Sequence, residues 1–150
     1  MVARRYGFTM VELVIAILIG SILTSIALAS FRNVTGRFAA RGAKQTFAAM
    51  HARTRATAVE SGQTVRLVMN SGADSAFIVR NDTILDVMRF DEEFNVDVRS
   101  TPSRFILCMG PQGYGDTDCS TTSSPITLQF WLNADSTTLI ILPMGQLVGL

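Results

Sequence analysis

The sequence contains none of the short motifs by which many enzymes are recognised. Its 150 residues include no Gly-x-Ser-x-Gly, no P-loop, no dinucleotide fingerprint and no helix with paired His and Glu metal ligands. The single histidine, His51, falls beside Arg53 in a predicted helix, where we expect a surface residue rather than a catalytic base. The chain is therefore predicted not to be an enzyme and to need no cofactor.

The sequence also has little net charge and few prolines. The net charge of +1 gives no bulk attraction to nucleic acid. No proline occurs before Pro102, and Gly62 is suited to end a helix, so one helix is predicted from Phe8 to about Ser61. Its second half carries an apolar stripe that we expect to pack on a sheet, made of Phe31, Val34, Phe38, Ala43, Phe47, Met50 and Thr54. Its arginines are expected to form a solvated or intersubunit polar face, namely Arg32, Arg37, Arg41, Arg53 and Arg55.

One carboxylate interrupts the most apolar part of the chain. Residues 8–29 read FTMVELVIAILIGSILTSIALA, and Glu12 is the only charge among them. A membrane-spanning helix needs roughly 20 mostly apolar residues, so this segment is long enough. A secretory signal would have a shorter apolar core. A plain membrane anchor leaves Glu12 unexplained, because an acidic group at that depth costs about 2.5–3.5 kcal/mol.

The run RRYGFTMVEL, from Arg4 to Leu13, resembles the type III signal of type IV prepilins and type II secretion pseudopilins. The resemblance implies that a prepilin peptidase cuts after Gly7 and then methylates the new amino terminus at Phe8. Residues 1–7 would be the removed leader, and residues 8–30 would be the transmembrane and filament-core helix. Glu12 falls on the glutamate of the family motif.

Cleavage would leave a cationic amine at Phe8, for which Glu12 is the natural countercharge. We expect Glu12 of one subunit to pair with the Phe8 amine of a neighbour in the filament. An unpaired carboxylate in apolar surroundings costs several kcal/mol, whereas a paired one is compensated. The pairing would thus favour one axial register between subunits. The alternative is a neutral, protonated Glu12 with no part in assembly.

From residue 63 onward the pattern changes to short strands. TVRLVMN (64–70) and SAFIVRN (75–81) alternate in polarity on either side of a polar turn and predict a hairpin. Further strand-like runs follow at 84–90, 94–100, 104–110, 126–133 and 137–145. We predict an α+β fold in which residues 31–62 form an amphipathic continuation of the helix. It packs on an antiparallel β-sheet or β-sandwich head formed by residues 63–150.

Two C-terminal runs, RFILCMGPQGYGD and TTLIILPMGQL, are similar to the GspH/FimT group of minor pilins and pseudopilins, whose head is almost wholly β. A head outside the cytoplasm favours a disulfide between Cys108 and Cys119, with two free thiols as the alternative. A metal site is disfavoured, because no histidine near the cysteines completes a four-ligand set. Asp116 and Asp118 belong to no complete calcium-binding run.

The resemblance implies a single pass through the bacterial inner membrane, with the leader in the cytoplasm and the head in the periplasm, before assembly into a pilus or pseudopilus. The expected partners are the prepilin peptidase, the inner-membrane assembly platform and other pilins or pseudopilins in a helical filament. The expected function is that of a minor structural subunit in initiation or at the tip. A major pilin remains an alternative, as does a DNA-binding minor pilin for natural transformation. The latter is disfavoured because no Lys or Arg follows Arg104.

Overall fold

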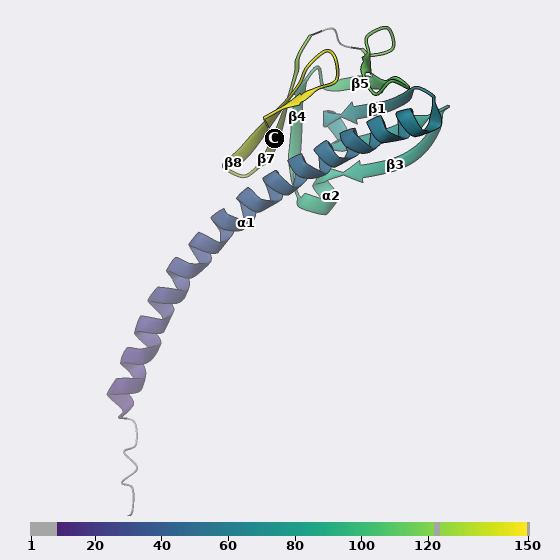
Figure 1. The fold of residues 1–150 in the computed structure, drawn as a ribbon. Coiled ribbons are helices and arrows are strands. Elements are labelled where there is room, and N and C mark those ends of the chain that lie inside the picture. Colours follow the sequence, from purple (N-terminus) through teal and green to yellow (C-terminus); the bar gives the residue numbers. More distant parts are fainter. Residues whose placement is uncertain (1–8, 122–123, 150) are drawn as a thin grey trace, which may run out of the picture. The chain divides into compact units, whose positions relative to one another are not determined.

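The computed structural model describes residues 9–121 and 124–149, and the side chains of these residues except 29–34. A long helix, α1 (Met10–Ser61), precedes a β-rich region (Figure 1). The chain divides into two compact units, Met1–Thr35 and Gly36–Leu150, so the boundary falls within α1. The second half of the helix therefore belongs to the same unit as the strands.

The C-terminal end of α1 is where the sequence predicts it. The helix ends at Ser61, and Gly62 follows with φ of +64°, the left-handed conformation that commonly terminates helices. The sequence also predicts the buried face from Ala43 onward correctly. Helical spacing brings five residues to that face, and all are buried: Ala43, Phe47, Met50, Thr54 and Ala58.

The prediction for Phe38 is wrong, because its side chain is 67% exposed. The step from Phe38 to Ala43 is five residues, which turns the helix about 140° beyond one full turn. Phe38 therefore faces away from the buried side of α1. The side chains of Phe31 and Val34 lie outside the described residues.

The strands form two antiparallel sheets within the described residues. The first has the order β3-β2-β1-β5-β6 and the second β4-β7-β8-β9. Their bounds are β1 Val65–Asn70, β2 Ser75–Arg80, β3 Thr83–Arg89, β4 Asp97–Thr101, β5 Arg104–Met109, β6 Gly115–Asp116, β7 Ile126–Leu132, β8 Asp135–Ile141 and β9 Leu147–Val148. The predicted hairpin is confirmed, since β1 pairs with β2 in a register that places Leu67 opposite Ile78. A short 3-10 turn, η1 (Ser71–Ala73), joins them.

Some elements differ from those predicted. The sequence Phe90–Phe94 forms a short helix, α2, so the strand expected at 94–100 begins only at Asp97. Three consecutive carboxylates in the first turn suit the N-terminus of a helix, and Asn95 ends it with φ of +53°. The two-residue strands β6 and β9 were not predicted.

The core of the second unit takes buried residues from α1, α2 and both sheets, and an aromatic cluster lies where α1, α2 and the second sheet meet. Phe47 of α1, Phe90 of α2 and Phe130 of β7 are fully buried. The ring centroid of Phe130 lies 6.2 Å from that of Phe47 and 5.7 Å from that of Phe90. Aromatic pairs at these separations add about 0.5–1.5 kcal/mol to their area burial. Three chain segments distant in sequence are thus fixed on one another.

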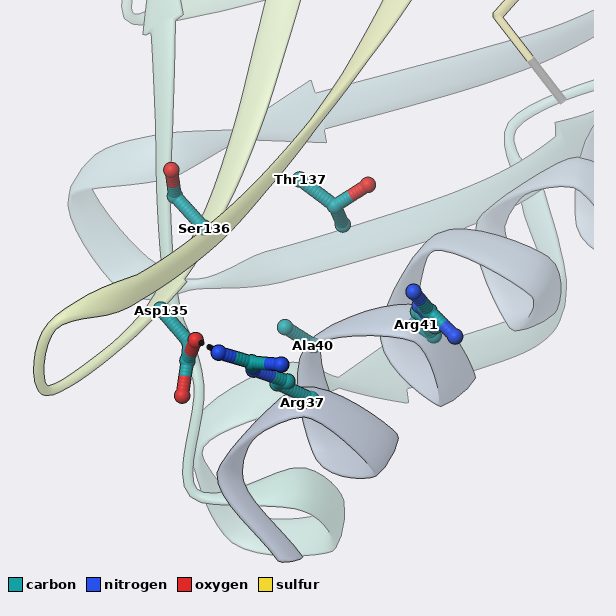
Figure 2. Close-up of a pocket in the computed structure, with 6 residues that line it drawn as sticks. All are labelled: Arg37, Ala40, Arg41, Asp135, Ser136 and Thr137. Atoms are coloured by element: carbon teal, nitrogen blue, oxygen red, sulfur yellow. Dashed lines mark hydrogen bonds and ion pairs between the residues drawn. The ribbon is translucent and has the colours of Figure 1, made fainter. Parts of the chain in front are cut away.

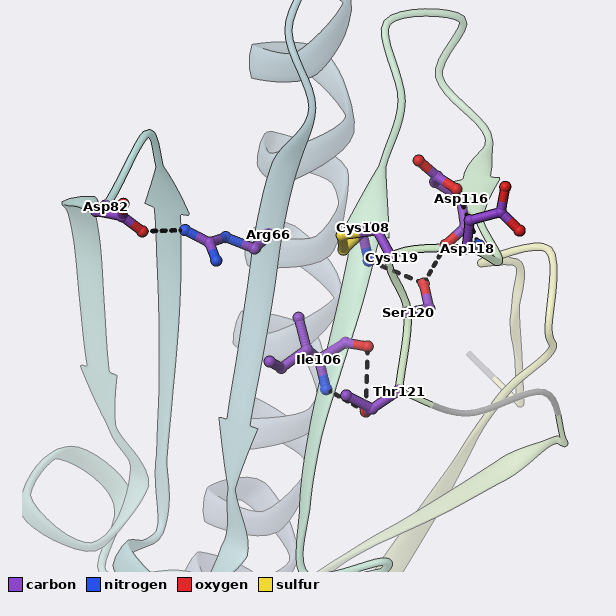
Figure 3. Close-up of a disulfide and its surroundings, with 9 residues drawn as sticks. All are labelled: Arg66, Asp82, Ile106, Cys108, Asp116, Asp118, Cys119, Ser120 and Thr121. Atoms are coloured by element: carbon purple, nitrogen blue, oxygen red, sulfur yellow. Dashed lines mark hydrogen bonds and ion pairs between the residues drawn. A yellow bond between two sulfur atoms is a disulfide. The ribbon is translucent and has the colours of Figure 1, made fainter.

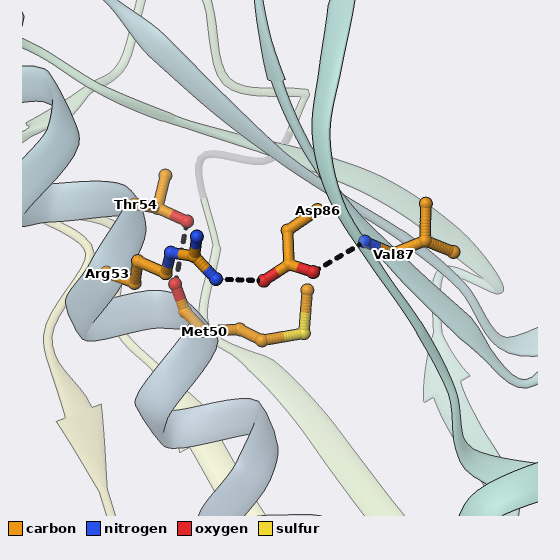
Figure 4. Close-up of polar contacts among 5 residues, drawn as sticks. All are labelled: Met50, Arg53, Thr54, Asp86 and Val87. Atoms are coloured by element: carbon orange, nitrogen blue, oxygen red, sulfur yellow. Dashed lines mark hydrogen bonds and ion pairs between the residues drawn. The ribbon is translucent and has the colours of Figure 1, made fainter.

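Polar contacts tie α1 to the open edge of the first sheet (Figure 4). Arg53 of α1 donates a hydrogen bond to Asp86 of the edge strand β3, and the other oxygen of Asp86 accepts the Val87 backbone N–H at 2.9 Å. The buried Thr54 hydroxyl donates to the carbonyl oxygen of Met50 within the helix. Because the Arg53–Asp86 pair is largely exposed, its stabilisation is small, about 0–1 kcal/mol.

Candidate functional site: the N-terminal stem and the disulfide-closed loop

The first part of α1 exposes a continuous apolar surface. Residues 10–28 are long and apolar enough to cross a membrane, judged by length and composition, and none of them is buried within the protein. Soluble monomers rarely leave so large an apolar surface in water. We call residues 8–30 the stem, and the length and apolar character of its described part suit a bilayer or neighbouring helices around it.

Three hydroxyl groups in the described part of the stem donate hydrogen bonds within the helix. Ser21 donates to the carbonyl oxygen of Leu18 at 2.8 Å, and Thr24 donates to that of Gly20 at 2.7 Å. Ser25 donates to the carbonyl oxygen of Ser21 at 2.9 Å. An unpaired hydroxyl in apolar surroundings is costly, so these bonds make the polar residues of the stem compatible with a bilayer.

Glu12 lies in the first turn of α1, which begins with a helix cap. The Glu12 backbone N–H donates to the Thr9 hydroxyl at 3.2 Å, and the Leu13 N–H donates to the Thr9 carbonyl oxygen at 3.2 Å. The Thr9-x-x-Glu12 spacing is that of a capping box. A carboxylate in the first turn is also favoured by the helix dipole. These contacts place the N-cap of the helix at Thr9, three residues before Glu12.

The carboxylate of Glu12 is exposed, and no described side chain pairs with it. The predicted cleavage residue Gly7 and the predicted methylation residue Phe8 lie outside the described residues. Cleavage, methylation and the Glu12–Phe8 pairing therefore stay predictions from the sequence.

The two cysteines are bonded to each other (Figure 3). Cys108 is buried on β5, and Cys119 is exposed in the loop that follows β6; their Cα atoms are 5.7 Å apart. Next to the bridge, the Ser120 hydroxyl accepts the Cys108 N–H at 3.1 Å and donates to the Asp116 carbonyl oxygen at 2.6 Å. The bridge and these bonds hold residues 108–119 as a closed loop, which we call the disulfide loop.

The disulfide loop joins the first sheet to the turn that follows β8. The Gly115 N–H donates to the Met144 carbonyl oxygen at 3.0 Å. A Cβ at Gly115 would lie 2.7 Å from the carbonyl carbon of Met144, which is closer than real Cβ contacts allow. Only glycine permits this approach, so β6 depends on Gly115 for its contact with the C-terminal turn.

His51 lies on the buried face of α1, and the prediction of a surface residue is wrong. It is 7% exposed, and its Nε2 has no hydrogen-bond partner in the described part of the chain. Burial lowers the pKa of His51, a hydrogen bond with the Gly145 backbone raises it, and the charge of Arg55 lowers it further. Its position four residues after Phe47 was a signal that the sequence offered.

Within residues 9–121 and 124–149 no group of three or more His, Cys, Asp or Glu side chains is placed to hold a metal ion. Asp116 instead accepts the Asp118 N–H at 3.0 Å, as part of the turn. The described residues thus provide an apolar stem and a loop that a disulfide closes on the β-rich unit.

Comparison with known proteins gave matches to the N-terminal segment and to the fold. Residues 2–28 match the family described as the prokaryotic N-terminal methylation motif. A crystal structure of the type IV minor pilin FimU from Pseudomonas aeruginosa (strain PAO1), in space group P21, matches with a TM-score of 0.57 and 12% identity, covering 76% of this chain and 90% of that chain. The FimU structure in space group P65 matches with a TM-score of 0.52 and 13% identity, covering 72% and 90%. No curated protein matches significantly.

Residues 2–28 thus carry the N-terminal methylation motif, and the fold resembles that of a type IV minor pilin. The predicted α+β pilin fold is confirmed. The particular protein that the chain resembles in fold is the minor pilin FimU, in agreement with the predicted resemblance to GspH/FimT-type minor pilins.

Proposed function

We propose that the chain is a minor pilin or pseudopilin that prepilin peptidase cleaves after Gly7 and methylates at Phe8. Its stem then assembles into a type IV pilus or a type II secretion pseudopilus, where the subunit acts in initiation or at the tip. The observation that carries the proposal is the methylation motif at residues 2–28, which leads into an exposed apolar helix with one acid in its first turn.

The proposed topology places the leader in the cytoplasm, the stem in the inner membrane and the head in the periplasm. The Cys108–Cys119 bridge supports this orientation, because disulfides persist in oxidising compartments and are rare in the cytoplasm. The assembly platform of the inner membrane would then transfer the processed subunit from the bilayer to the filament. Neighbouring stems would replace lipid around the apolar helix.

In our proposal, Glu12 sets the axial register between the subunit and its neighbours when the subunit moves from the bilayer into the filament. The acid carries an insertion cost in the membrane and pairs with the methylated Phe8 amine of a neighbouring subunit in the filament. Because a carboxylate without a partner costs several kcal/mol in apolar surroundings, offsets that leave Glu12 unpaired are disfavoured. The cap at Thr9 supports the geometry by fixing where the helix begins relative to Glu12.

The experiment compares Glu12→Gln with Ser25→Ala in cells that assemble filaments. Glu12→Gln keeps the size of the side chain but removes its charge, and Ser25→Ala changes a hydroxyl that bonds within the helix. We expect both variants to be processed and membrane-inserted, and Glu12→Gln to enter sheared filaments about tenfold less than wild type. Wild-type incorporation of Glu12→Gln would favour the neutral, uninvolved Glu12.

Processing itself is tested by mass spectrometry of the chain recovered from filaments. We expect a polypeptide that begins at Phe8 and carries one added methyl group at its amine. Recovery of filament subunits that retain Met1 to Gly7 would refute the proposed processing.

A further inference from the structure

The last residues that the structure describes, 142–149, form a segment that α1 holds at two points within the second unit. Lys44 Nζ donates to the Gly149 carbonyl oxygen at 2.6 Å. His51 forms a hydrogen bond with the Gly145 backbone. Because Lys44 and His51 are seven residues apart, they lie on the same face of the helix. We call residues 142–149 the C-terminal strap.

The strap has few other contacts that resist its opening. Gly145 is its only buried residue, and its strand β9 pairs with β8 over two residues at the edge of the second sheet. A hydrogen bond from the Gly115 N–H to the Met144 carbonyl oxygen ties it to the disulfide loop. Segments near a chain end with little burial open at a lower free-energy cost than the strands of a core.

Strand β8, which precedes the strap, is anchored independently of it. Each of its seven residues is paired with β7. At its start, Asp135 Oδ1 accepts a hydrogen bond from Arg37 Nε of α1 at 3.1 Å (Figure 2). Near its end, Leu139 and Ile141 are buried in the core. Opening of the strap can therefore stop at the end of β8 and leave the second sheet folded.

His51 is a titratable group that the closed strap helps to keep from water. It is 7% exposed, and its Nε2 has no hydrogen-bond partner among the described residues. A proton on the ring would place a charge, and an N–H group without an acceptor, inside the closed head. The hydrogen bond with Gly145 favours the protonated ring, but burial outweighs it and lowers the pKa of His51. A proton therefore favours any state in which water reaches the ring.

The charged groups around His51 do not compensate a proton on its ring. Arg55, four residues later on α1, lowers the pKa of His51 further, and its guanidinium lies 5.9 Å from the centroid of the Tyr114 ring. The strap has no titratable side chain. The disulfide loop carries Asp116 and Asp118, but Asp116 accepts the Asp118 N–H, and neither acid is among the groups that shift the pKa of His51.

We propose that the C-terminal strap is an acid-released latch, in which protonation of His51 opens residues 142–149 while β8 and the rest of the head stay folded. Opening gives the ring access to water and leaves the outer edge of β8 unpaired at Ile140 and Ile141. An uncovered strand edge is a template for pairing with another strand. The latch belongs to the head alone and does not depend on the proposed assembly.

Amide hydrogen exchange of the full-length chain in mild detergent, read by mass spectrometry, tests the latch. Labelling times are scaled to the intrinsic pH dependence of exchange, and peptides from the strap are compared with peptides from the β1–β2 hairpin. Between about pH 7 and 5 we expect protection of the strap to fall several-fold and to stay below that of the hairpin. Strap protection that does not change with pH would overturn the proposal. Strap protection equal to that of the hairpin would also overturn it, because the strap would then open only by global unfolding.

Substitutions in α1 identify the group responsible. His51→Gln keeps a hydrogen-bonding side chain but cannot titrate, so protection of its strap should be the same at both pH values. Lys44→Met is the matched control, because it removes the other contact with the strap and should lower protection by the same factor at both pH values. A pH dependence that survives in His51→Gln would refute the latch.

A variant outside the contact keeps the test decisive if His51→Gln fails to fold. Arg55→Gln removes the charge that lowers the pKa of His51, so the folded head should tolerate the proton better. We expect the loss of strap protection between about pH 7 and 5 to be smaller than in wild type. An equal or larger loss would contradict the role of His51.

Discussion

Removing the Cys108–Cys119 bridge should lower the free energy of unfolding of the head by an amount that depends on the length of the closed loop. The bridge joins residues separated by 11 positions. The chain-entropy relation for a loop of that size gives about 3 kcal/mol at 25 °C, because an open chain gains conformations mainly in the unfolded state. A small domain is stable by only about 5–15 kcal/mol in total, so the predicted loss is a large fraction.

The variant for this test combines Cys108→Ala with Cys119→Ser. Alanine is chosen at Cys108 because that position is fully buried, and a serine hydroxyl there would add a desolvation cost unrelated to the bridge. Serine suits Cys119, which is exposed. The bonds of Ser120 to Cys108 and Asp116 involve backbone groups at those two positions, so the substitutions leave them available.

Urea unfolding of the full-length chain in mild detergent supplies the measurement. Trp131 is the only tryptophan, lies half-buried on β7 and has the Arg99 guanidinium 5.0 Å from its ring centroid, so its fluorescence reports on the second sheet. The free energy of unfolding of the oxidised wild type should be about 3 kcal/mol higher than that of the variant or of the reduced wild type. A difference below about 1 kcal/mol, with the bridge verified by mass spectrometry, would refute the entropic reasoning.

Two further predictions concern the C-terminal turn. Gly115→Ala should lower the free energy of unfolding by about 1–3 kcal/mol, since its Cβ would meet the Met144 backbone at 2.7 Å. Gly72→Ala, whose Cβ would meet Asn70 at 3.4 Å, should lose less in the same urea assay, and equal losses would contradict the steric argument. Burial lowers the pKa of His51 from 6.5, so the unfolded chain binds a proton at this side chain more readily than the folded chain does. The stability associated with the neutral His51 is complete above about pH 6.5 and declines as the pH falls toward the folded-state pKa. His51→Leu should flatten the dependence of unfolding free energy on pH between about pH 5 and 7, and an unchanged slope would exclude His51 as its source.

Local patterns predicted the elements that depend on neighbouring residues. Helical spacing from Ala43 to Thr54 gave the buried face of α1, Gly62 gave its end, and alternating polarity gave the β1–β2 hairpin. In each case the signal and the structure it specifies lie within a few residues or a few turns. The apolar run with Glu12 is of the same kind, because its length and its single charge can be counted directly.

Features that depend on distant residues were not predictable from local patterns. Arg37 and Asp135 are 98 residues apart in sequence, so nothing near either residue indicates the ion pair between them. The hydrogen bond between His51 and the Gly145 backbone likewise joins segments far apart in sequence. Strands β6 and β9 have two residues each, too short for any alternation of polarity to appear. Their positions come from the disulfide loop and from the turn after β8.

The distribution of charge along α1 bears on the proposed assembly contact of the stem. Between Glu12 and Glu60 the charged residues of the helix are all basic and begin at Arg32, so Glu12 has no opposite charge three or four residues after it on the helix. Within the described residues Glu12 remains unpaired. In our proposal the amino terminus of an adjoining subunit compensates it. A subunit displaced along the filament axis would lose that contact, so a charge left unpaired within one chain would specify how neighbouring chains align.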